Sequence, residues 1–459
     1  MIYEVSNGLL KEISIPTDNQ YTGDYGNSCS LLVDKIDDDW YSIIYSKANK
    51  SYLIKGDNEK NLFLHSKVFS TVNDKSDDDM QLPFPFADKT TTFIIVLSYA
   101  CNYKCKYCYQ QNSKSLSKTR MSEDTLSSVL DVIAEYLKKN TDRKVQIGLF
   151  GGEPLLVENY SLITKIFDFC VTKKISIGIT TNGKNLDYYL KLLIIYRSLG
   201  ITVCSTIDSI EDNEFTRTPV QLSKLHQNVT NELLSNVKLL IDNGVHVDLE
   251  TNIDSHNIRK IGSIIDYYRN NGYLDNPFFT FGFGRVDDRF YETNYSRIIS
   301  YVDILTELSN INSIPSKMYI SFLRSAYELA RKIGMNYGQT ELKIPGTYCW
   351  ASSPLDTVFY VDPDLKTYRC TYTVGRSNYS IMDFTFDNIE NYQLKKITSD
   401  DYNNCKSCPI AGYCAGGCKL SADIDFNRQC KDEKEQFYRF LHEIYYPKLL
   451  QLLYKRINK

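Results

Sequence analysis

The stretch from residue 92 to 282 alternates between two kinds of hydrophobic pattern. Short runs of apolar and β-branched residues predict buried strands, and the longer segments between them, with apolar residues at helical spacing, predict amphipathic helices. Strands that alternate with helices in this way indicate a parallel sheet with crossover helices, an α/β fold. Six such units predict a partial (β/α)6 TIM-type barrel, whose ligands lie at the carboxyl ends of the strands. The predicted strands are 92–97, 145–150, 176–180, 202–207, 246–252 and 278–282, and the predicted helices are 122–137, 157–173, 187–199, 224–243 and 258–271.

The segments on either side of this barrel have different patterns. Two runs rich in aromatic and β-branched residues, Trp40 to Ser46 and Ser51 to Ile54, flank a polar turn and predict a β-hairpin. A helix is predicted over 60–69, so the first part of the chain is expected to be a small α+β domain. The predicted order is a small domain (1–75), an acidic, proline-interrupted linker (76–91), the barrel (92–310), connecting helices (311–345), a cysteine-rich domain (346–431) and a last helix (432–459).

Composition excludes several classes of function. The 459 residues are 42% hydrophobic and 24% charged, which is typical of a globular protein with two or three domains. The formal net charge of -3 gives no basic field, so no nucleic-acid partner is expected. There is no apolar run of about 18 residues and no signal-peptide pattern, so we expect a cytoplasmic protein that does not bind a membrane.

Thirteen cysteines in a cytoplasmic chain indicate metal ligands or catalytic thiols rather than disulfides. Cys101, Cys105 and Cys108 lie on one predicted loop, with three and two residues between them. Three thiolates at this spacing can hold three corners of a [4Fe-4S] cube and leave the fourth iron open to a substrate. The alternative is a zinc site, which needs a fourth ligand from elsewhere. Three isolated cysteines, Cys29, Cys170 and Cys204, are predicted to be small buried hydrophobic residues.

A second group of cysteines lies near the C-terminus. It is too large for one four-coordinate metal, so it predicts two iron-sulfur clusters, with a pair of zinc sites as the alternative. The group consists of Cys349, Cys370, Cys405, Cys408, Cys414, Cys418 and Cys430.

Glycine and polar residues gather where the predicted barrel strands end. In the segment Gly-Gly-Glu-Pro after the second strand, the glycines let backbone groups approach a ligand closely. Because parallel strands end at one edge of a sheet, these residues are expected to lie together. Each taken singly is equally consistent with a cap or a turn. The candidate ligand-binding residues are Gly151, Gly152, Glu153, Thr181, Asn182, Ser205, Asp208, Arg217 and Asn252.

The three-cysteine loop, with the aromatic Tyr107 before its last cysteine, and the Gly-Gly-Glu-Pro segment resemble the motifs of radical S-adenosylmethionine (SAM) enzymes. The resemblance implies that SAM binds the open iron and that an electron from the reduced cluster cleaves it to a 5'-deoxyadenosyl radical. It implies further that the Gly151 to Glu153 segment holds the amino group of SAM, with Ser205 at the ribose, Arg217 at the carboxylate and Asn252 at either. A reduced flavodoxin or ferredoxin is then the expected electron donor.

The C-terminal cysteine spacing resembles the SPASM domain, which holds two auxiliary [4Fe-4S] clusters in radical SAM enzymes that modify peptides and proteins. The resemblance assigns Cys405, Cys408, Cys414 and Cys430 to the outer cluster. It assigns Cys349, Cys370 and Cys418 to the inner cluster, which then lacks an obvious fourth thiol. Leu365 stands where the family usually has glycine, so we expect a changed turn there.

The resemblance favours a maturase of a ribosomally made precursor peptide, in which hydrogen abstraction leads to a carbon-sulfur or carbon-carbon crosslink. Residues 1–75 are then expected to be a winged-helix-like domain that binds the leader peptide by adding it to a sheet edge, with the hairpin of residues 40–54 as that edge. The alternative is that this domain is a structural extension of the chain with no binding role.

Two other functions are consistent with the same cysteines. An anaerobic sulfatase-maturing enzyme, which makes formylglycine, shares both motifs, but such enzymes usually have an aspartate base where this chain has Thr371. A non-catalytic iron-sulfur or zinc protein would leave the glycine-rich strand ends unexplained. No general base is identified; Tyr372, Asp356 and Glu250 lie near plausible positions.

Overall fold

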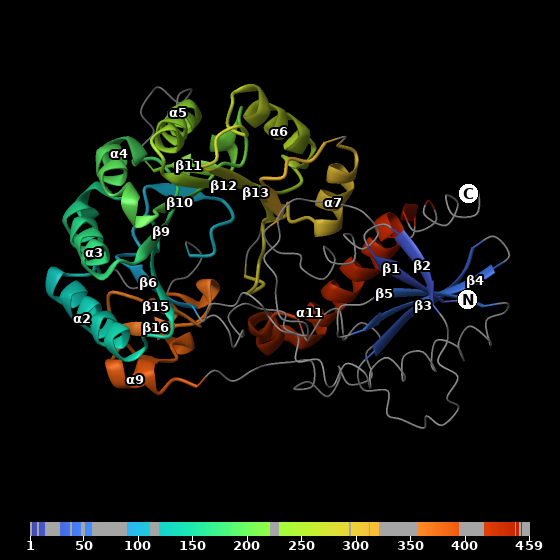
Figure 1. Ribbon diagram of the computed structural model, residues 1–459, viewed down its shortest axis with the longest axis horizontal. Helices are drawn as coiled ribbons and strands as arrows, with labels where there is room; N and C mark the ends of the chain where they lie inside the picture. The colour runs from blue at the N-terminus through green and yellow to red at the C-terminus, as the bar shows by residue number, and fades with distance from the viewer. Residues whose placement is uncertain are drawn as a thin grey trace.

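The computed structural model describes residues 2–6, 9–13, 28–36, 39–46, 51–56, 90–110, 119–220, 229–292, 295–311, 313–320, 357–393, 417–445, 447–448 and 451. They form one ten-stranded sheet lined by helices and a five-stranded antiparallel sheet from the N-terminal residues (Figure 1). The predicted helix 60–69, most of the predicted linker and the part of the predicted connecting helices after residue 320 lie outside the described residues.

Six parallel strands form the centre of the large sheet, and each predicted barrel strand is confirmed to within three residues at either end. They are β6 (Thr90–Val96), β8 (Lys144–Phe150), β9 (Ser176–Thr181), β10 (Thr202–Thr206), β12 (His246–Ile253) and β13 (Phe279–Arg285). Along β12, Val247 and Leu249 are buried in the apolar core, whereas the alternating His246, Asp248 and Glu250 are only half-buried. This alternation places a polar face on the inner side of the curved sheet.

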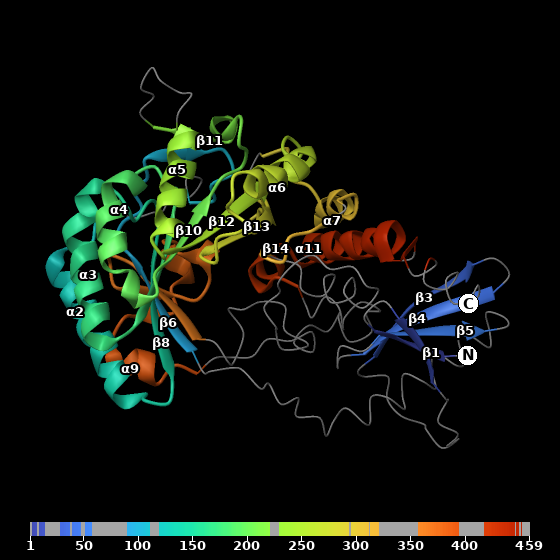
Figure 2. The same cartoon turned by 45° about the horizontal axis from the view of Figure 1, so that its top comes forward.

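The five predicted crossover helices are also present, and they cover the outer side of the sheet (Figures 1 and 2). The first is capped by Ser122, whose side chain accepts a hydrogen bond from the Thr125 backbone N–H at 3.0 Å. Their apolar faces and the outer faces of the strands share one core. The helices are α2 (Glu123–Lys139), α3 (Tyr160–Lys173), α4 (Leu186–Ile195), α5 (Val229–Asp242) and α6 (Ile261–Asn270).

The sheet is longer than predicted at one edge. Helix α7 (Tyr301–Ser309) ends just before the segment 311–345, where connecting helices are predicted. Within that segment, residues 318–320 form strand β14 (Met318–Ile320), which pairs parallel with β13. The prediction of helices throughout this region is therefore wrong for these three residues. Three residues are too few to show a period, so only pairing with β13 identifies them as a strand.

At the other edge, the C-terminal part continues the same sheet. β15 (Thr357–Val361) pairs parallel with β6, so that Phe359 lies opposite Phe93, and their rings stack with centroids 5.9 Å apart. β16 (Lys366–Tyr368) and β17 (Met382–Asp383) follow with antiparallel pairing. The short helix α9 (Phe386–Glu390) returns to α2, where Glu390 accepts a hydrogen bond from Asn140 at 2.9 Å. The cysteine-rich region is thus joined to the barrel through shared backbone hydrogen bonds.

The N-terminal antiparallel sheet corrects one expectation. Its strands β1 (Ile2–Ser6), β2 (Leu9–Ile13), β3 (Ser28–Ile36), β4 (Asp39–Ser46) and β5 (Ser51–Gly56) are ordered β2-β1-β5-β4-β3. The predicted hairpin is β4–β5, but β4 also pairs with β3, and β5 also pairs with β1. The hairpin therefore lies inside the sheet. Among the described strands, the edges are β2 and β3.

The last long helix starts earlier than predicted. α11 (Lys419–Phe440) begins before Asp432 and so includes Cys430, with non-helical backbone angles at Asp425. A π-helical turn, Leu441–Tyr445, follows it and packs against α7 (Figure 2). In the described part of the chain no helix combines the length and apolar character needed to cross a membrane.

Candidate functional site

The loop that carries the first three cysteines is held by a two-stranded ladder. β7 (Tyr103–Cys105) pairs antiparallel with β11 (Arg217–Pro219), which places Cys105 opposite Arg217. The Lys106 N–H donates to the Thr216 carbonyl at 2.9 Å and extends this ladder. All three thiols are half-buried. The loop after β6 is thereby fixed to the segment after β10, although the two are distant in sequence.

The glycine pair after β8 packs directly against the residues that lead into this loop. A Cβ atom on Gly152 would lie 2.2 Å from the Ala100 carbonyl oxygen, and one on Gly151 would lie 2.5 Å from that of Ser98. Gly151 also has a φ of 134°, which side-chain-bearing residues rarely adopt. The Glu153 N–H donates to the Ala100 carbonyl at 2.8 Å. These glycines therefore allow the second strand end to contact the backbone beside Cys101.

Glu153 joins the second and third strand ends. Its side chain is 1% exposed. One carboxylate oxygen accepts hydrogen bonds from the Leu155 N–H at 2.8 Å and the Thr181 hydroxyl at 2.6 Å, and the other accepts from the Asn182 N–H at 2.7 Å. Burial raises the pKa of Glu153, although these donors oppose the shift. Asn182 in turn points its amide at the Cys101 sulfur, 3.7 Å away, and at Asn102, 2.7 Å away.

Three further candidate residues meet at one hydroxyl group. The Tyr107 hydroxyl donates to Asp208 at 2.8 Å and accepts from Arg217 and from the Asn252 amide, each at 3.1 Å. Asp208 also accepts from the Thr216 hydroxyl at 2.6 Å. Burial raises the pKa of Tyr107 well above its usual value, so the hydroxyl keeps its proton. Sequence reasoning placed Asp208, Arg217 and Asn252 at the site but missed that Tyr107 connects them.

Three buried polar atoms in and beside this network have no hydrogen-bond partner. Ser205 Oγ, Asp208 Oδ1 and Arg217 Nε are buried, and none has a hydrogen-bond partner. Such groups cost about 1–3 kcal/mol each when left unpaired, so native proteins rarely bury them without a function. All three belong to residues predicted to contact SAM. Their spare donors and acceptors fit a ligand with hydroxyl and carboxylate groups.

The three thiols of the loop suit an iron-sulfur cube better than a single ion. Burial raises the pKa of Cys101 to about 11 and that of Cys105 to about 12, so these thiols need a bound cation to ionise at neutral pH. Within the described residues, no three side chains among His, Cys, Asp and Glu converge closely enough to hold one metal ion. A cube needs no such convergence, because each thiolate ligates a different iron.

Two C-terminal cysteines lie close to this loop. Tyr372 interacts electrostatically with both Cys370 and Cys418, and its ring packs on that of Tyr109, directly after Cys108, with centroids 4.6 Å apart. Two of the three cysteines predicted to hold the inner cluster thus lie within electrostatic range of the same tyrosine. Cys430 lies on α11, and the other four, Cys349, Cys405, Cys408 and Cys414, lie outside the described residues.

A buried carboxylate connects the C-terminal hairpin to the cysteine loop. Asp362, at the β15–β16 turn, accepts hydrogen bonds from the hydroxyl groups of Tyr99 at 3.1 Å and Tyr368 at 3.0 Å. Leu365, in the same turn, has a φ of 57°, the left-handed region that favours glycine. The turn expected to change thus has a backbone conformation that glycine would adopt without strain.

The three residues considered as general bases differ in their surroundings. Burial raises the pKa of Tyr372, so its phenol remains protonated and is a poor base. Glu250 lies on the inner face of β12, opposite Thr206 and Gly282 of the neighbouring strands, and is half-buried. Asp356 lies outside the described residues. The geometry of the described residues does not select a base.

Comparisons with known proteins show a family match over the barrel residues. Residues 95–268 match the family described as the Radical SAM superfamily. The curated relatives include a GTP 3',8-cyclase of Synechocystis, 29% identical over 38% of this chain and 49% of the relative, so the chain spans about half the length of that protein. They also include the radical SAM cyclopropyl synthase TigE of Paramaledivibacter caminithermalis, 23% identical over 71% of this chain and 66% of the relative. A third is the cysteine-type anaerobic sulfatase-maturating enzyme of Clostridium perfringens, 20% identical over 77% and 96%.

Two solved structures share the fold at low identity. anSMEcpe with bound AdoMet and the Cp18Cys peptide has a TM-score of 0.56 and 17% identity, covering 79% of this chain and 99% of that chain. SuiB of Streptococcus suis bound to S-adenosylmethionine has a TM-score of 0.52 and 12% identity, covering 86% and 97%. Residues 95–268, which carry the three-cysteine loop at the carboxyl edge of the sheet, thus form a domain that matches the Radical SAM superfamily.

Proposed function

We propose that this protein is a radical SAM maturase that abstracts a hydrogen atom from a carbon of a ribosomally made precursor peptide and forms a carbon-sulfur or carbon-carbon crosslink. The second hydrogen would leave as a proton, and its electron would pass to an auxiliary cluster. The observation that carries the SAM-binding part is the group of buried, unpartnered atoms on Ser205, Asp208 and Arg217 beside the cysteine loop. When bound, SAM and a reduced [4Fe-4S] cluster supply a 5'-deoxyadenosyl radical that removes hydrogen from carbon.

Some residues of the site would bind the cluster or SAM, and others position those side chains. Cys101, Cys105 and Cys108 would ligate the cluster, and Asn182 orients the first thiol by its contact with the sulfur. The Tyr107 hydroxyl fixes Arg217, whose charge suits the carboxylate of SAM. At the ribose of SAM, the unpartnered Ser205 hydroxyl would donate or accept a hydrogen bond, and the unpartnered Asp208 oxygen would accept one.

The peptide substrate is supported by the C-terminal region and by the relatives. Cys370 and Cys418 lie beside Tyr372, next to the first cysteine loop, as two auxiliary [4Fe-4S] clusters near the substrate would require. SuiB has also been solved with its precursor peptide SuiA, and TigE is named as a cyclopropyl synthase. We assign the remaining C-terminal cysteines to these clusters by their spacing.

The N-terminal sheet is the proposed leader-binding site. β2 and β3 are its edges among the described strands, and an extended peptide adds to a sheet by hydrogen bonding to an edge. A reduced flavodoxin or ferredoxin is the proposed electron donor.

The test is anaerobic reconstitution, followed by iron and sulfide counting and by chromatography of SAM after reduction with dithionite. We expect close to twelve irons per chain, the content of three cubes, and 5'-deoxyadenosine from the wild type. The triple variant Cys101→Ala/Cys105→Ala/Cys108→Ala should lose about four irons and all cleavage. Zinc in place of iron, or no cleavage by the loaded wild type, would contradict the proposal.

A second candidate function is that of an anaerobic sulfatase-maturing enzyme. The similarity to the Clostridium perfringens enzyme over 96% of its length favours it. Against it, Thr371 replaces the expected aspartate, and its hydroxyl is hydrogen-bonded to Tyr360 at 2.7 Å. Mass spectrometry of a sulfatase-derived cysteine peptide after incubation decides between the two, because formylglycine forms only if this second function is correct.

A further inference from the structure

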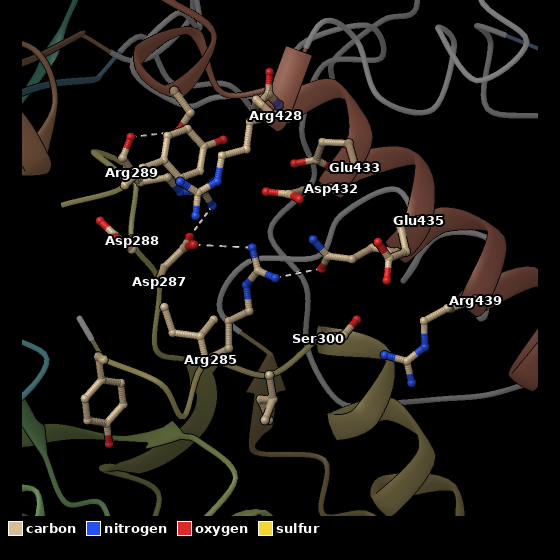
Figure 3. Close-up of a pocket in the computed structure, with 17 residues that line it drawn as sticks. Arg285, Asp287, Asp288, Arg289, Ser300, Arg428, Asp432, Glu433, Glu435 and Arg439 are labelled. Carbon is tan, nitrogen blue, oxygen red and sulfur yellow. Dashed lines mark hydrogen bonds and ion pairs between the residues drawn. The ribbon is translucent and has the colours of Figure 1, made fainter. Parts of the chain in front are cut away.

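A polar pocket of about 440 Å³ opens between the carboxyl end of β13 and helix α11 (Figure 3). The residues that line this β13–α11 pocket include Arg285, Asp287, Arg289 and Tyr295 on the barrel side, and Arg428, Asp432 and Glu435 on the helix side. Its volume falls in the range of sites that bind small molecules or a few residues of a peptide.

The pocket adjoins the candidate SAM site. Tyr295 lines it, and the ring of Tyr295 meets that of Tyr107 edge-on with centroids 6.1 Å apart. Asp287 and Arg289 of the lining also lie within electrostatic range of Tyr372, whose ring packs on that of Tyr109 in the cysteine loop. A ligand in the pocket would therefore lie near the cysteine loop, where a substrate must be placed to react.

The arginines of the pocket already have partners. Arg285 bonds to Asp287 at 3.3 Å and to the Gln436 side chain at 2.7 Å, and Arg289 forms an ion pair with the same aspartate. Figure 3 shows both guanidinium groups turned toward Asp287. A phosphate or carboxylate ligand would have to compete with these bonds, which disfavours a nucleotide.

The remaining two arginines are also engaged. Arg439 pairs with Asp303 at 2.7 Å and with Glu443, neither of which lines the pocket. Arg428 lies over the ring of Tyr291, 4.1 Å from its centre. The residues that line the pocket carry five carboxylates and four guanidinium groups. Because the charge of Arg439 is balanced by carboxylates that do not line the pocket, the pocket has a surplus of negative charge.

This surplus is located on α11. Asp432 and Glu435 lie one helical turn apart, and neither forms an ion pair or a hydrogen bond with another described residue. Figure 3 shows Asp432 extending from the helix into the pocket. Burial raises the pKa of Asp432, and Glu435 adds to this rise, although Arg428 and Arg285 oppose it. A cation placed between these two carboxylates would relieve their repulsion.

A second unpartnered group lines the same pocket. Gln429 is 3% exposed, and its Nε2 has no hydrogen-bond partner. Its amide packs against Gly417, which does not line the pocket, so the groups that the pocket presents to a ligand cation are the α11 carboxylates.

We propose that the β13–α11 pocket binds a segment of the substrate peptide that carries a lysine or arginine side chain, with Asp432 and Glu435 accepting the cation. This inference rests on the proposed peptide substrate and specifies its chemistry. It also predicts that peptides with an acidic residue at the same position are rejected.

The test measures binding of three fluorescent hexapeptides to the reconstituted full chain by fluorescence polarisation at low salt. The peptides are identical except for a central lysine, glutamine or glutamate. We expect the lysine peptide to bind at least about tenfold more tightly than the glutamate peptide. The variant Asp432→Asn/Glu435→Gln should remove the preference, and Asp432→Lys/Glu435→Lys should invert it.

The matched control is Asp131→Asn/Glu135→Gln, which makes the same charge change at two exposed positions on α2 and should keep the preference. Equal binding of the three peptides, no binding of any of them, or a preference unchanged in the α11 variants would overturn the inference. SAM cleavage is assayed on the same samples. Cleavage without a lysine preference rejects this inference alone, whereas a lysine preference without cleavage rejects the radical chemistry alone.

Discussion

The Tyr107 hydroxyl group donates a hydrogen bond of 2.8 Å to Asp208, so a residue between two cysteines of the loop is bonded directly to the segment that follows the fourth barrel strand. Asp208 is 1% exposed and keeps one oxygen unpartnered. Because the same hydroxyl accepts a hydrogen bond from Arg217, it fixes the positions of one carboxylate and one guanidinium group beside the cysteines. This arrangement makes Tyr107 a positioning residue for the proposed SAM site.

Replacing Tyr107 by phenylalanine should weaken SAM binding while leaving the cluster in place. The change leaves Asp208, Arg217 and Asn252 each without one hydrogen bond, which should lower stability by about 1–3 kcal/mol and SAM affinity about tenfold. Isothermal titration of SAM into the iron-loaded protein measures the affinity, and iron counting checks the cluster. Tyr188→Phe, which removes a hydroxyl from a side chain 49% exposed on α4, should change neither. Unchanged SAM affinity in Tyr107→Phe would remove the positioning role.

Replacing Gly152 by alanine should disturb the cysteine loop. Its Cβ would lie 2.2 Å from one backbone carbonyl oxygen and 2.5 Å from another, and backbone cannot move aside as a flexible side chain can. We expect a loss of about 1–3 kcal/mol of stability and lower iron incorporation at the first cluster. Gly178→Ala in β9 is the control, because a Cβ there meets nothing within 4 Å. Equal iron content and urea midpoints in the two variants would show that the close approach does not matter.

Replacing Glu153 by glutamine should loosen the second and third strand ends. The carboxylate accepts from three donors, and an amide in its place turns an N–H toward one of them. The expected loss of stability is about 1–3 kcal/mol in urea unfolding, with weaker SAM binding because Asn182 is displaced. Glu158→Gln changes an exposed carboxylate nearby and should behave like the wild type. Wild-type stability in Glu153→Gln would mean that the turn holds without this acceptor.

Stability should fall with rising pH above 9 partly because of Cys170. This side chain is fully buried, and burial raises its pKa from 9.0 to about 12. Between these values the folded protein keeps the proton and the unfolded chain releases it, so the contribution to stability is complete below pH 9 and is lost as pH rises toward 12. The slope for one such group is about 1.4 kcal/mol per pH unit. Urea unfolding between pH 8 and 11 should show a shallower slope in Cys170→Ala, and identical slopes would contradict the assignment.

The sequence by itself determined the barrel and the chemistry of its edge. Apolar runs and helical spacing are local signals, and they located all six central strands and their five helices because each element buries a face that its own sequence defines. Cysteine spacing and the Gly-Gly-Glu segment are local in the same sense, so the three-cysteine loop and its neighbouring turns were found at the predicted strand ends.

Only the tertiary structure decided what depends on partners distant in sequence. Three residues of β14 carry no period, and β4 and β5 became inner strands of their sheet only through pairing with β3 and β1. The sequence shows Tyr107 only as the aromatic residue before the last cysteine of the loop. Its hydroxyl group gains its role because folding brings Asp208, Arg217 and Asn252 to it. The physical reason is the same in each case. A strand pair or a side-chain hydrogen bond has two partners, and a local sequence pattern contains only one of them.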